Sequence, residues 1–316
     1  MKTNTDRLIN SFRRTSFLTV AAVYFLILVG GVVRSTGSGM GCPDWPKCFG
    51  SVIPPTQVDQ LPKNYQEIYL AQRLAKNQRF VGTLEKLGFE DTAHRIANDK
   101  SILIEEEFNA TKTWIEYINR LIGVAIGLLI IITLWKSLKL WKIDKLIPIL
   151  AFVALALVLF IGWIGSIVVS TNLLAWMITI HMLLALALVG VLLYINHRSE
   201  RLQPSCGVRV EIPAKVRWIL IFAAILMLIQ VVLGTQVREE IDRISFALGN
   251  LMREEWVGQI GIKFIIHRSF SLLLLVVHVL YFFWAFKYSV RKSKVQVWSQ
   301  VLMLVLILEI ATGIGM

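Results

Sequence analysis

The sequence predicts an all-α integral membrane protein composed of two pseudo-symmetric four-helix bundles. Three observations point to this class. Hydrophobic residues make up 56% of the 316 residues, and the mean hydropathy is +0.64. The apolar residues are also gathered into long runs. A soluble globular domain of this length does not need so much apolar material, so the membrane class comes first.

The apolar runs have the length that a membrane requires. A helix that spans a bilayer needs about 20 mostly apolar residues. Seven such runs occur, at residues 16–33, 113–135, 146–169, 174–195, 216–234, 261–286 and 297–315. The first run is too long for a cleaved signal peptide. We therefore expect seven transmembrane helices within these residues.

Basic residues indicate the orientation of the helices. Lys and Arg gather in alternate connections, at residues 2–14, 136–145, 198–217 and 287–294. The positive-inside rule then places the N-terminus in the cytoplasm and the long first loop, residues 35–112, outside. We expect the inner membrane of a bacterium, with this loop in the periplasm. Because the cations are divided among short loops, their expected partners are anionic membrane lipids rather than nucleic acid.

The long first loop carries two further signals. Residues 64–87 and 89–108 have apolar side chains at helical spacing, which predicts two or three short helices. Cys42 and Cys48 lie outside the membrane, where disulfides persist, and they enclose the stretch Pro-Asp-Trp-Pro-Lys. We expect them to form a disulfide, which is either a structural cross-link or a redox-responsive pair.

An internal repeat divides the chain into two halves. The stretch "LVGGVVRSTG" from Leu28 resembles "VLGTQVREEI" from Val232, so that Gly30 aligns with Gly234. The stretch "EYINRLIG" aligns with "FIIHRSFS", which places Asn119 opposite His267. We expect an N-terminal four-helix half at residues 1–195 and a C-terminal half at residues 196–316. The second half shows three helices, so the repeat predicts an eighth helix beyond residue 316.

Polar residues within the spanning runs are the candidate functional residues, because such residues are costly in a membrane. Those expected at one depth near the outer surface are Glu116, Asn119, Arg120, His181, His267 and Arg268. A histidine in a helical bundle can ligate haem iron, and an adjacent arginine can pair with a haem propionate. The alternative is a histidine that hydrogen-bonds a neighbouring helix.

Glu116 and a further histidine, His278, leave alternatives open. Glu116 lies one helical turn from Asn119, which makes it a candidate proton carrier; alternatively, it pairs with Arg120 or with a cation of the loop. His278 lies on the same helix face as His267 but about 16 Å deeper. It is either a structural histidine or the ligand of a second haem.

The motifs resemble those of the heme A synthase family. The run "GGVVRSTGSGMGCPDWPKCFGSVIPP" is similar to its first-loop signature, and "EYINR" resembles its Glu-x-x-His-Arg motif. The stretches "TIHMLLALAL" and "IIHRSFSLLLLVV" resemble its fourth-helix and sixth-helix histidine motifs. The resemblance implies oxidation of the ring D methyl group of haem O, through an alcohol, to the formyl group of haem A for cytochrome oxidase.

The resemblance also assigns the sites and partners. It implies a haem b in the C-terminal half, ligated by His267 and a histidine in the eighth helix. The substrate, haem O, is expected in the N-terminal half near Glu116, Asn119 and His181, delivered by haem O synthase and oxidised with an unidentified electron donor. The loop with Cys42 and Cys48 would cover the mouth of this pocket as an outer lid.

One residue departs from the family pattern. Asn119 stands where the family has histidine, and an asparagine amide is a poor ligand for haem iron. The first half then offers His181 as its protein ligand and leaves the opposite coordination position open. Two other functions remain to be considered, namely a membrane cytochrome b type electron-transfer protein that modifies no haem, and a non-catalytic haem-carrying assembly factor.

Overall fold

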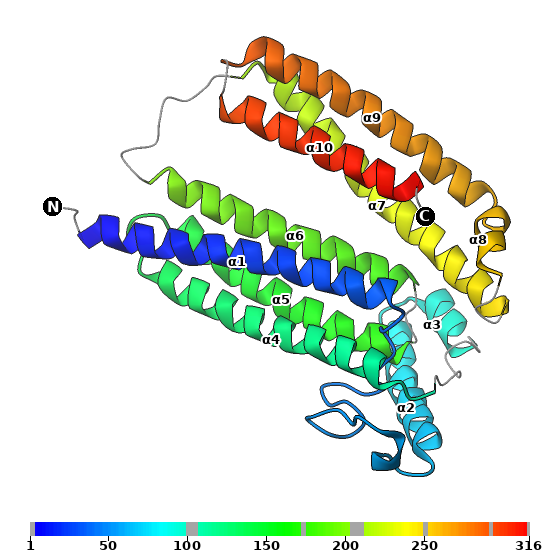
Figure 1. Ribbon diagram of the computed structural model, residues 1–316. Helices are drawn as coiled ribbons and strands as arrows, with labels where there is room; N and C mark the ends of the chain where they lie inside the picture. Colours follow the sequence, from blue (N-terminus) through cyan, green and yellow to red (C-terminus); the bar gives the residue numbers. More distant parts are fainter. Residues whose placement is uncertain are drawn as a thin grey trace. The chain divides into compact units, whose positions relative to one another are not determined.

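The computed structural model describes residues 4–98, 107–171, 175–202, 212–248, 252–290 and 293–314. The secondary structure of these residues is helical, apart from an isolated bridge between Cys48 and Ser51 (Figure 1). The long helices are α1 (Asn4–Ser35), α4 (Ala110–Leu138), α5 (Leu146–Ser170), α6 (Ala175–Glu200), α7 (Ala214–Ala247), α9 (Ile262–Tyr288) and α10 (Lys294–Ile314). The shorter elements are η1 (Val58–Gln60), α2 (Tyr65–Lys86), α3 (Glu90–Ala97) and α8 (Arg253–Gln259).

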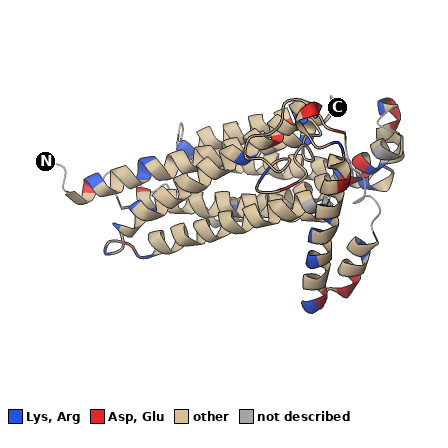
Figure 2. Cartoon of the chain, turned by 90° about the horizontal axis from the view of Figure 1, so that it is seen from below, with Lys and Arg blue, Asp and Glu red and all other residues tan. Residues whose placement is uncertain are grey.

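The seven long helices are each long and apolar enough to cross a membrane. They coincide with the seven predicted runs and confirm an all-α integral membrane protein. Figure 2 shows Lys, Arg, Asp and Glu concentrated near the helix ends and on the shorter elements, while the middle of the long helices is almost free of charge. This is the distribution that a hydrocarbon layer imposes on spanning helices.

Two of the helices extend well beyond their apolar runs. Helix α1 begins at Asn4, although its apolar run begins at residue 16, and α7 continues to Ala247, although its run ends at residue 234. The hydropathy of the sequence shows where contact with lipid ends. The backbone hydrogen bonding of a helix can continue beyond that point, where polar side chains on the helix surface contact water or one another. In the extension of α7, Arg238 and Asp242 form an ion pair of 3.0 Å one helical turn apart.

The chain divides into two compact units, Met1–Cys206 and Gly207–Met316. In the first unit, α1 packs on α4 and α6, and α5 packs on the same two helices, which closes a four-helix bundle. Its apolar core includes Phe12, Ile130, Leu140, Leu192 and Ile195. These residues lie at the end of the bundle away from the disulfide loop. We call the end that carries the disulfide loop the outer end.

An extension made of α2 and α3 covers part of the outer end of the first unit. Helix α2 packs on α3 and on α5, and it runs across rather than along the bundle helices (Figures 1 and 2). Phe80 of α2 joins two apolar clusters, one with Leu84 and Ala93 and one with Ile164 and Met177 of the bundle. The predicted short helices of the long loop are therefore present, and they are anchored on α5 and α6.

The second unit contains α7, α8, α9 and α10 among its described residues. Helix α9 packs on both α7 and α10, and α8 packs on α7. The α7–α9 contact is apolar and includes Ala223 and Leu226 of α7 with Leu274 and Val277 of α9. A second cluster, which includes Val237 and Ile244 of α7 and Phe264 of α9, joins the last turns of α7 to the first turns of α9.

Candidate functional site

The disulfide loop crosses the first turn of α4 at Gly41. A Cβ atom added to Gly41 would lie 2.6 Å from the carbonyl oxygen of Lys112 and 2.7 Å from the backbone nitrogen of Thr113. Such a contact between a side chain and rigid backbone cannot form, so only glycine fits this crossing. The hydroxyl of Thr113 then donates a hydrogen bond of 2.8 Å to the carbonyl oxygen of Gly41.

Cys42 and Cys48 form the predicted disulfide, with their Cα atoms 4.9 Å apart. Both cysteines are fully buried. Inside the ring that they close, the carboxylate of Asp44 accepts the backbone N–H groups of Phe49 at 2.6 Å and Gly50 at 2.9 Å. Both of these residues have positive φ angles, a conformation that Phe49 adopts only with support from its surroundings. The Asp44 carboxylate supplies that support.

The ring of Phe49 joins the loop to the extension. It makes edge-on contacts with Tyr69 at 5.3 Å, Phe108 at 5.4 Å and Tyr65 at 6.2 Å between ring centroids. Burial, and then the nearby Asp44 carboxylate, raise the pKa of the Tyr69 hydroxyl. Helix α2 therefore packs against the disulfide loop through Phe49, and the Asp44 carboxylate of the loop acts electrostatically on Tyr69 of α2.

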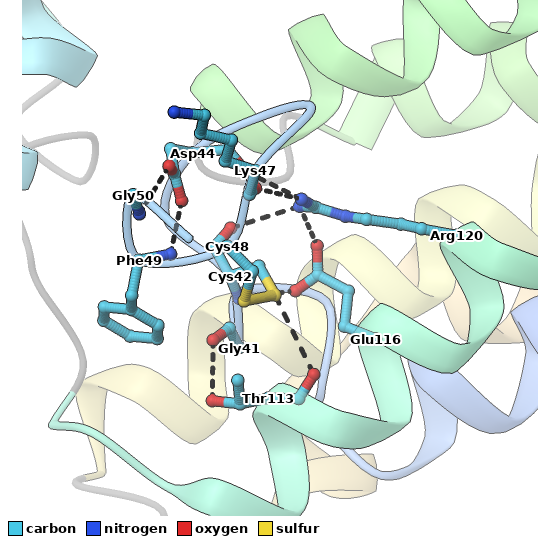
Figure 3. Close-up of a disulfide and its surroundings, with 10 residues drawn as sticks. All are labelled: Gly41, Cys42, Asp44, Lys47, Cys48, Phe49, Gly50, Thr113, Glu116 and Arg120. Atoms are coloured by element: carbon cyan, nitrogen blue, oxygen red, sulfur yellow. Dashed lines mark hydrogen bonds and ion pairs between the residues drawn. A yellow bond between two sulfur atoms is a disulfide. The ribbon is translucent and has the colours of Figure 1, made fainter. Parts of the chain in front are cut away.

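Glu116 and Arg120 of α4 hold the disulfide loop from the membrane side (Figure 3). Glu116 is only 4% exposed. Its Oε2 accepts the backbone N–H of Cys42 at 2.8 Å, and its Oε1 accepts a hydrogen bond of 2.5 Å from the guanidinium of Arg120. The structure thus shows the Glu116–Arg120 pair that the sequence left as one of two alternatives.

The guanidinium of Arg120 is engaged mainly by the loop backbone. It donates to the carbonyl oxygens of Asp44 at 2.7 Å, Lys47 at 2.9 Å and Cys42 at 3.2 Å, in addition to Glu116. These four bonds involve both terminal nitrogens of the side chain. The role of Arg120 in this structure is to fix the disulfide loop, and its predicted pairing with a haem propionate stays a prediction.

His181 and His267 lie in matching environments in the two units. A Cβ atom added to Gly165 of α5 would lie 3.4 Å from Cε1 and 3.9 Å from Nδ1 of His181. One added to Gly234 of α7 would lie 3.3 Å and 3.8 Å from the same atoms of His267. Each imidazole therefore lies against a glycine of the neighbouring helix, where a Cβ atom would touch the ring.

The two imidazoles also share an unsatisfied atom. Nδ1 of His181 and Nδ1 of His267 are buried, and neither makes a hydrogen bond of good geometry within the described residues. The His181 ring interacts with the backbone of Ile161 on α5, whereas the His267 ring has no such neighbour in the described part of the chain. A buried polar atom without a partner is costly and calls for an explanation. A haem-ligating histidine binds iron through one ring nitrogen and turns the other toward the protein. Neither imidazole is committed to a side chain within the described residues, so both residues fit a haem ligand.

The other candidate residues are less constrained. The buried Oδ1 of Asn119 has no hydrogen-bond partner within the described part of the chain. Arg268 is exposed and lies 5.6 Å above the ring of Phe264. Among the described residues, no hydrogen bond or ion pair joins Glu116 to Asn119 or to His181. The ligand and catalytic assignments of these residues therefore remain predictions.

His278 is buried, and its Nδ1 donates a hydrogen bond of 2.8 Å to the carbonyl oxygen of Leu274 in its own helix. This bond leaves Nε2 of His278 available, so it is compatible with a structural histidine and with a second haem ligand, and both interpretations stay predictions. The sequence analysis missed the roles of Gly41, Asp44 and Gly165. No local pattern pointed to Asp44, because its hydrogen bonds go to residues five and six positions later, beyond the reach of an ordinary Asx turn.

Comparisons with known proteins agree with the resemblance in the motifs. The family described as "Cytochrome oxidase assembly protein" matches residues 13–96 and 78–316. Similar curated proteins are named heme A synthase. That of Shewanella oneidensis is 26% identical over 190 residues, which cover 60% of this chain and 46% of the relative. That of Shouchella clausii is 24% identical over 315 residues, covering 96% of this chain and 85% of the relative.

A third relative, the heme A synthase of Wolbachia pipientis, is 25% identical over 230 residues, covering 69% of this chain and 57% of the relative. The matched region thus spans less than half of the Shewanella protein and little more than half of the Wolbachia protein. No solved structure matches the chain significantly. The family match extends over almost all of the sequence, from the first spanning helix to the last residue. This chain therefore belongs to the cytochrome oxidase assembly protein family.

Proposed function

We propose that this chain is a heme A synthase, which oxidises the ring D methyl group of haem O to the formyl group of haem A. The observation that carries the proposal is the matched pair of histidines, His181 and His267, each against a glycine of the neighbouring helix and each with a buried Nδ1 that makes no hydrogen bond of good geometry within the described residues. The names of the three curated relatives support the same activity.

The two histidines have different tasks in this proposal. His267 holds a resident haem b in the second unit, where Arg268 is exposed and free to meet a propionate. His181 holds the substrate haem in the first unit. Haem iron supplies the oxidative chemistry when it is bound, and the protein contributes ligation, orientation and exclusion of water.

Glu116 is the group that moves protons in the first unit. Oxidation of an alcohol to an aldehyde removes the hydroxyl proton, and a carboxylate is a suitable acceptor. Glu116 is held in one orientation by the N–H of Cys42 and the guanidinium of Arg120. The disulfide loop covers this carboxylate, so proton transfer takes place away from bulk water.

The proposal includes a location and partners. The N-terminus lies in the cytoplasm of a bacterium, and the disulfide loop lies on the periplasmic side. Haem O arrives from haem O synthase through the membrane. A third partner is an electron donor, whose identity the sequence leaves open.

The test is haem analysis in a host that makes haem O but has no heme A synthase of its own. Cells expressing this chain should yield haem A, or its alcohol precursor, after extraction and chromatography. Cells expressing His181→Ala should keep the second-unit haem b but make no haem A, whereas His267→Ala should lose haem b. If the parental chain yields only haem b and unmodified haem O, the proposed activity is wrong.

A further inference from the structure

Gln230 of α7 lies against His267 of α9. Its Nε2 donates a hydrogen bond of 3.2 Å to the backbone carbonyl oxygen of His267. One turn further along α7, Gly234 faces the imidazole ring of the same histidine. Residues four apart share one face of a helix. The face of α7 that carries Gln230 and Gly234 therefore meets both the backbone and the side chain of His267.

Two buried polar atoms at this contact have no hydrogen-bond partner within the described residues. They are the Oε1 atom of Gln230 and the Nδ1 atom of His267. An amide oxygen can only accept a hydrogen bond. A neutral imidazole whose Nε2 binds a metal carries its proton on Nδ1 and must donate it. The two unsatisfied atoms are thus complementary.

The internal repeat supports a link between these two residues. In the register that aligns Gly30 with Gly234 and Asn119 with His267, the position of Gln230 corresponds to Leu26. Leu26 packs against the apolar core of the first unit. The C-terminal half, which has His267 at this position of the repeat, also has Gln230. The N-terminal half, which has Asn119 at the matching position, has the aliphatic residue Leu26 in place of the glutamine.

We infer that Gln230 is the positioning residue of His267. Its Oε1 accepts the Nδ1–H of the imidazole while its Nε2 holds the backbone carbonyl of the same residue. This selects the tautomer with Nε2 free for haem iron and makes the imidazole a stronger ligand. The inference rests on the proposed function, because it requires a haem bound by His267.

The test compares variants of the full-length protein in a His181→Ala background, so that the remaining haem is that of the second unit. Gln230→Leu removes the acceptor and should speed loss of haem to an acceptor protein by about 10–100-fold. It should also raise the midpoint potential of the haem, because a less basic ligand stabilises ferric iron less. Gln230→Glu, a stronger acceptor, should retain the haem and lower the potential.

The matched control is Ile229→Ala, the neighbouring position on α7, whose side chain is 43% exposed. It should leave the rate of haem loss and the potential unchanged. If Gln230→Leu and Gln230→Glu both keep the parental potential and haem retention while His267→Ala loses the haem, the inference is wrong and the proposed function stands. If His267→Ala retains the haem, the ligand assignment fails, and the inference fails with it.

Discussion

The backbone N–H of Cys42 donates a hydrogen bond of 2.8 Å to Oε2 of Glu116, across a sequence separation of 74 residues. The position of the carboxylate therefore depends on the disulfide loop, and the loop depends on the carboxylate. Arg120 strengthens this dependence, because it bonds Glu116 and three carbonyl oxygens of the loop. Any change in the loop is expected to reach Glu116 directly.

Replacing Glu116 with glutamine tests its role in proton transfer. Glu116→Gln keeps the size of the side chain and an acceptor for Cys42 but removes the charge. Haem content should stay near the parental level, while haem A production falls by about 10²–10⁴-fold, the usual contribution of a general acid–base group. Haem extraction and chromatography measure both quantities.

The matched control for this substitution is Glu85→Gln, an exposed carboxylate on α2, which should leave haem A production unchanged. Production of haem A at the parental rate by Glu116→Gln would exclude the carboxylate from the reaction.

Opening the disulfide ring should weaken the outer end of the first unit. Replacing Cys42 and Cys48 together with serine removes a cross-link over a short ring, and we expect the free energy of unfolding to fall by about 2 kcal/mol. Haem A production should fall as well, because Arg120 and Glu116 lose their fixed partners. Thermal unfolding of the purified protein measures the first effect.

Treatment of the parental protein with a reductant should reproduce both effects of the double variant. Free labelling of both thiols in freshly isolated membranes, without reductant, would show that the cross-link does not operate in the cell.

Adding a methyl group beneath either histidine should loosen its haem. In Gly165→Ala and Gly234→Ala, the new Cβ would lie 3.4 Å and 3.3 Å from the respective imidazole rings. The contact at Gly234 requires the His267 ring to shift by a few tenths of an ångström, whereas the contact at Gly165 is close to ordinary van der Waals contact. Gly234→Ala should therefore lose haem from the second unit, and Gly165→Ala should lose less from the first. Absorbance of haem per protein measures the loss.

Gly162→Ala is the control, since a Cβ there would meet no described atom within 4 Å. Equal haem content in all three variants would contradict the assignment of these histidines as ligands.

Asn119 offers a test by gain of a ligand. Its Oδ1 is buried without a partner among the described residues, and the repeat places it opposite His267. Asn119→His should give the first-unit haem a second protein ligand, convert it to a low-spin spectrum, and slow haem A production by closing the open coordination position. Optical and electron paramagnetic resonance spectra report the ligand change. Faster turnover in this variant would contradict the open-site interpretation.

The sequence predicted the spanning helices well, because hydropathy follows directly from contact with lipid. It predicted the ends of α1 and α7 poorly, because a helix continues beyond the membrane wherever pairs such as Arg238 and Asp242 allow it. The disulfide followed from topology and spacing. The partners of Arg120 could not be predicted, because they are mainly backbone carbonyl groups, and carbonyl groups carry no sequence signal.

In the candidate site, too, some residues could be predicted from the sequence, and others could be found only in the folded structure. Residue type, position within the spanning runs and the family resemblance together identified His181 and His267 as potential ligands. The internal repeat also drew attention to Gly234, which aligns with Gly30. The contact between His181 and Gly165 was not predicted, because it depends on how α5 and α6 pack. The role of Asp44 also required the folded loop, since its two hydrogen bonds go to residues five and six positions later.

The backbone crossing at Gly41 limits how this protein can diverge during evolution. Most positions in an exposed loop drift freely, but a side chain at position 41 would collide with the carbonyl of Lys112. Neighbouring mutations cannot relieve this collision, because the obstructing atoms belong to the main chain and are the same whatever residue occupies position 112. A library of all substitutions at position 41 should therefore yield glycine alone among functional clones, and a relative without glycine there must route its loop differently.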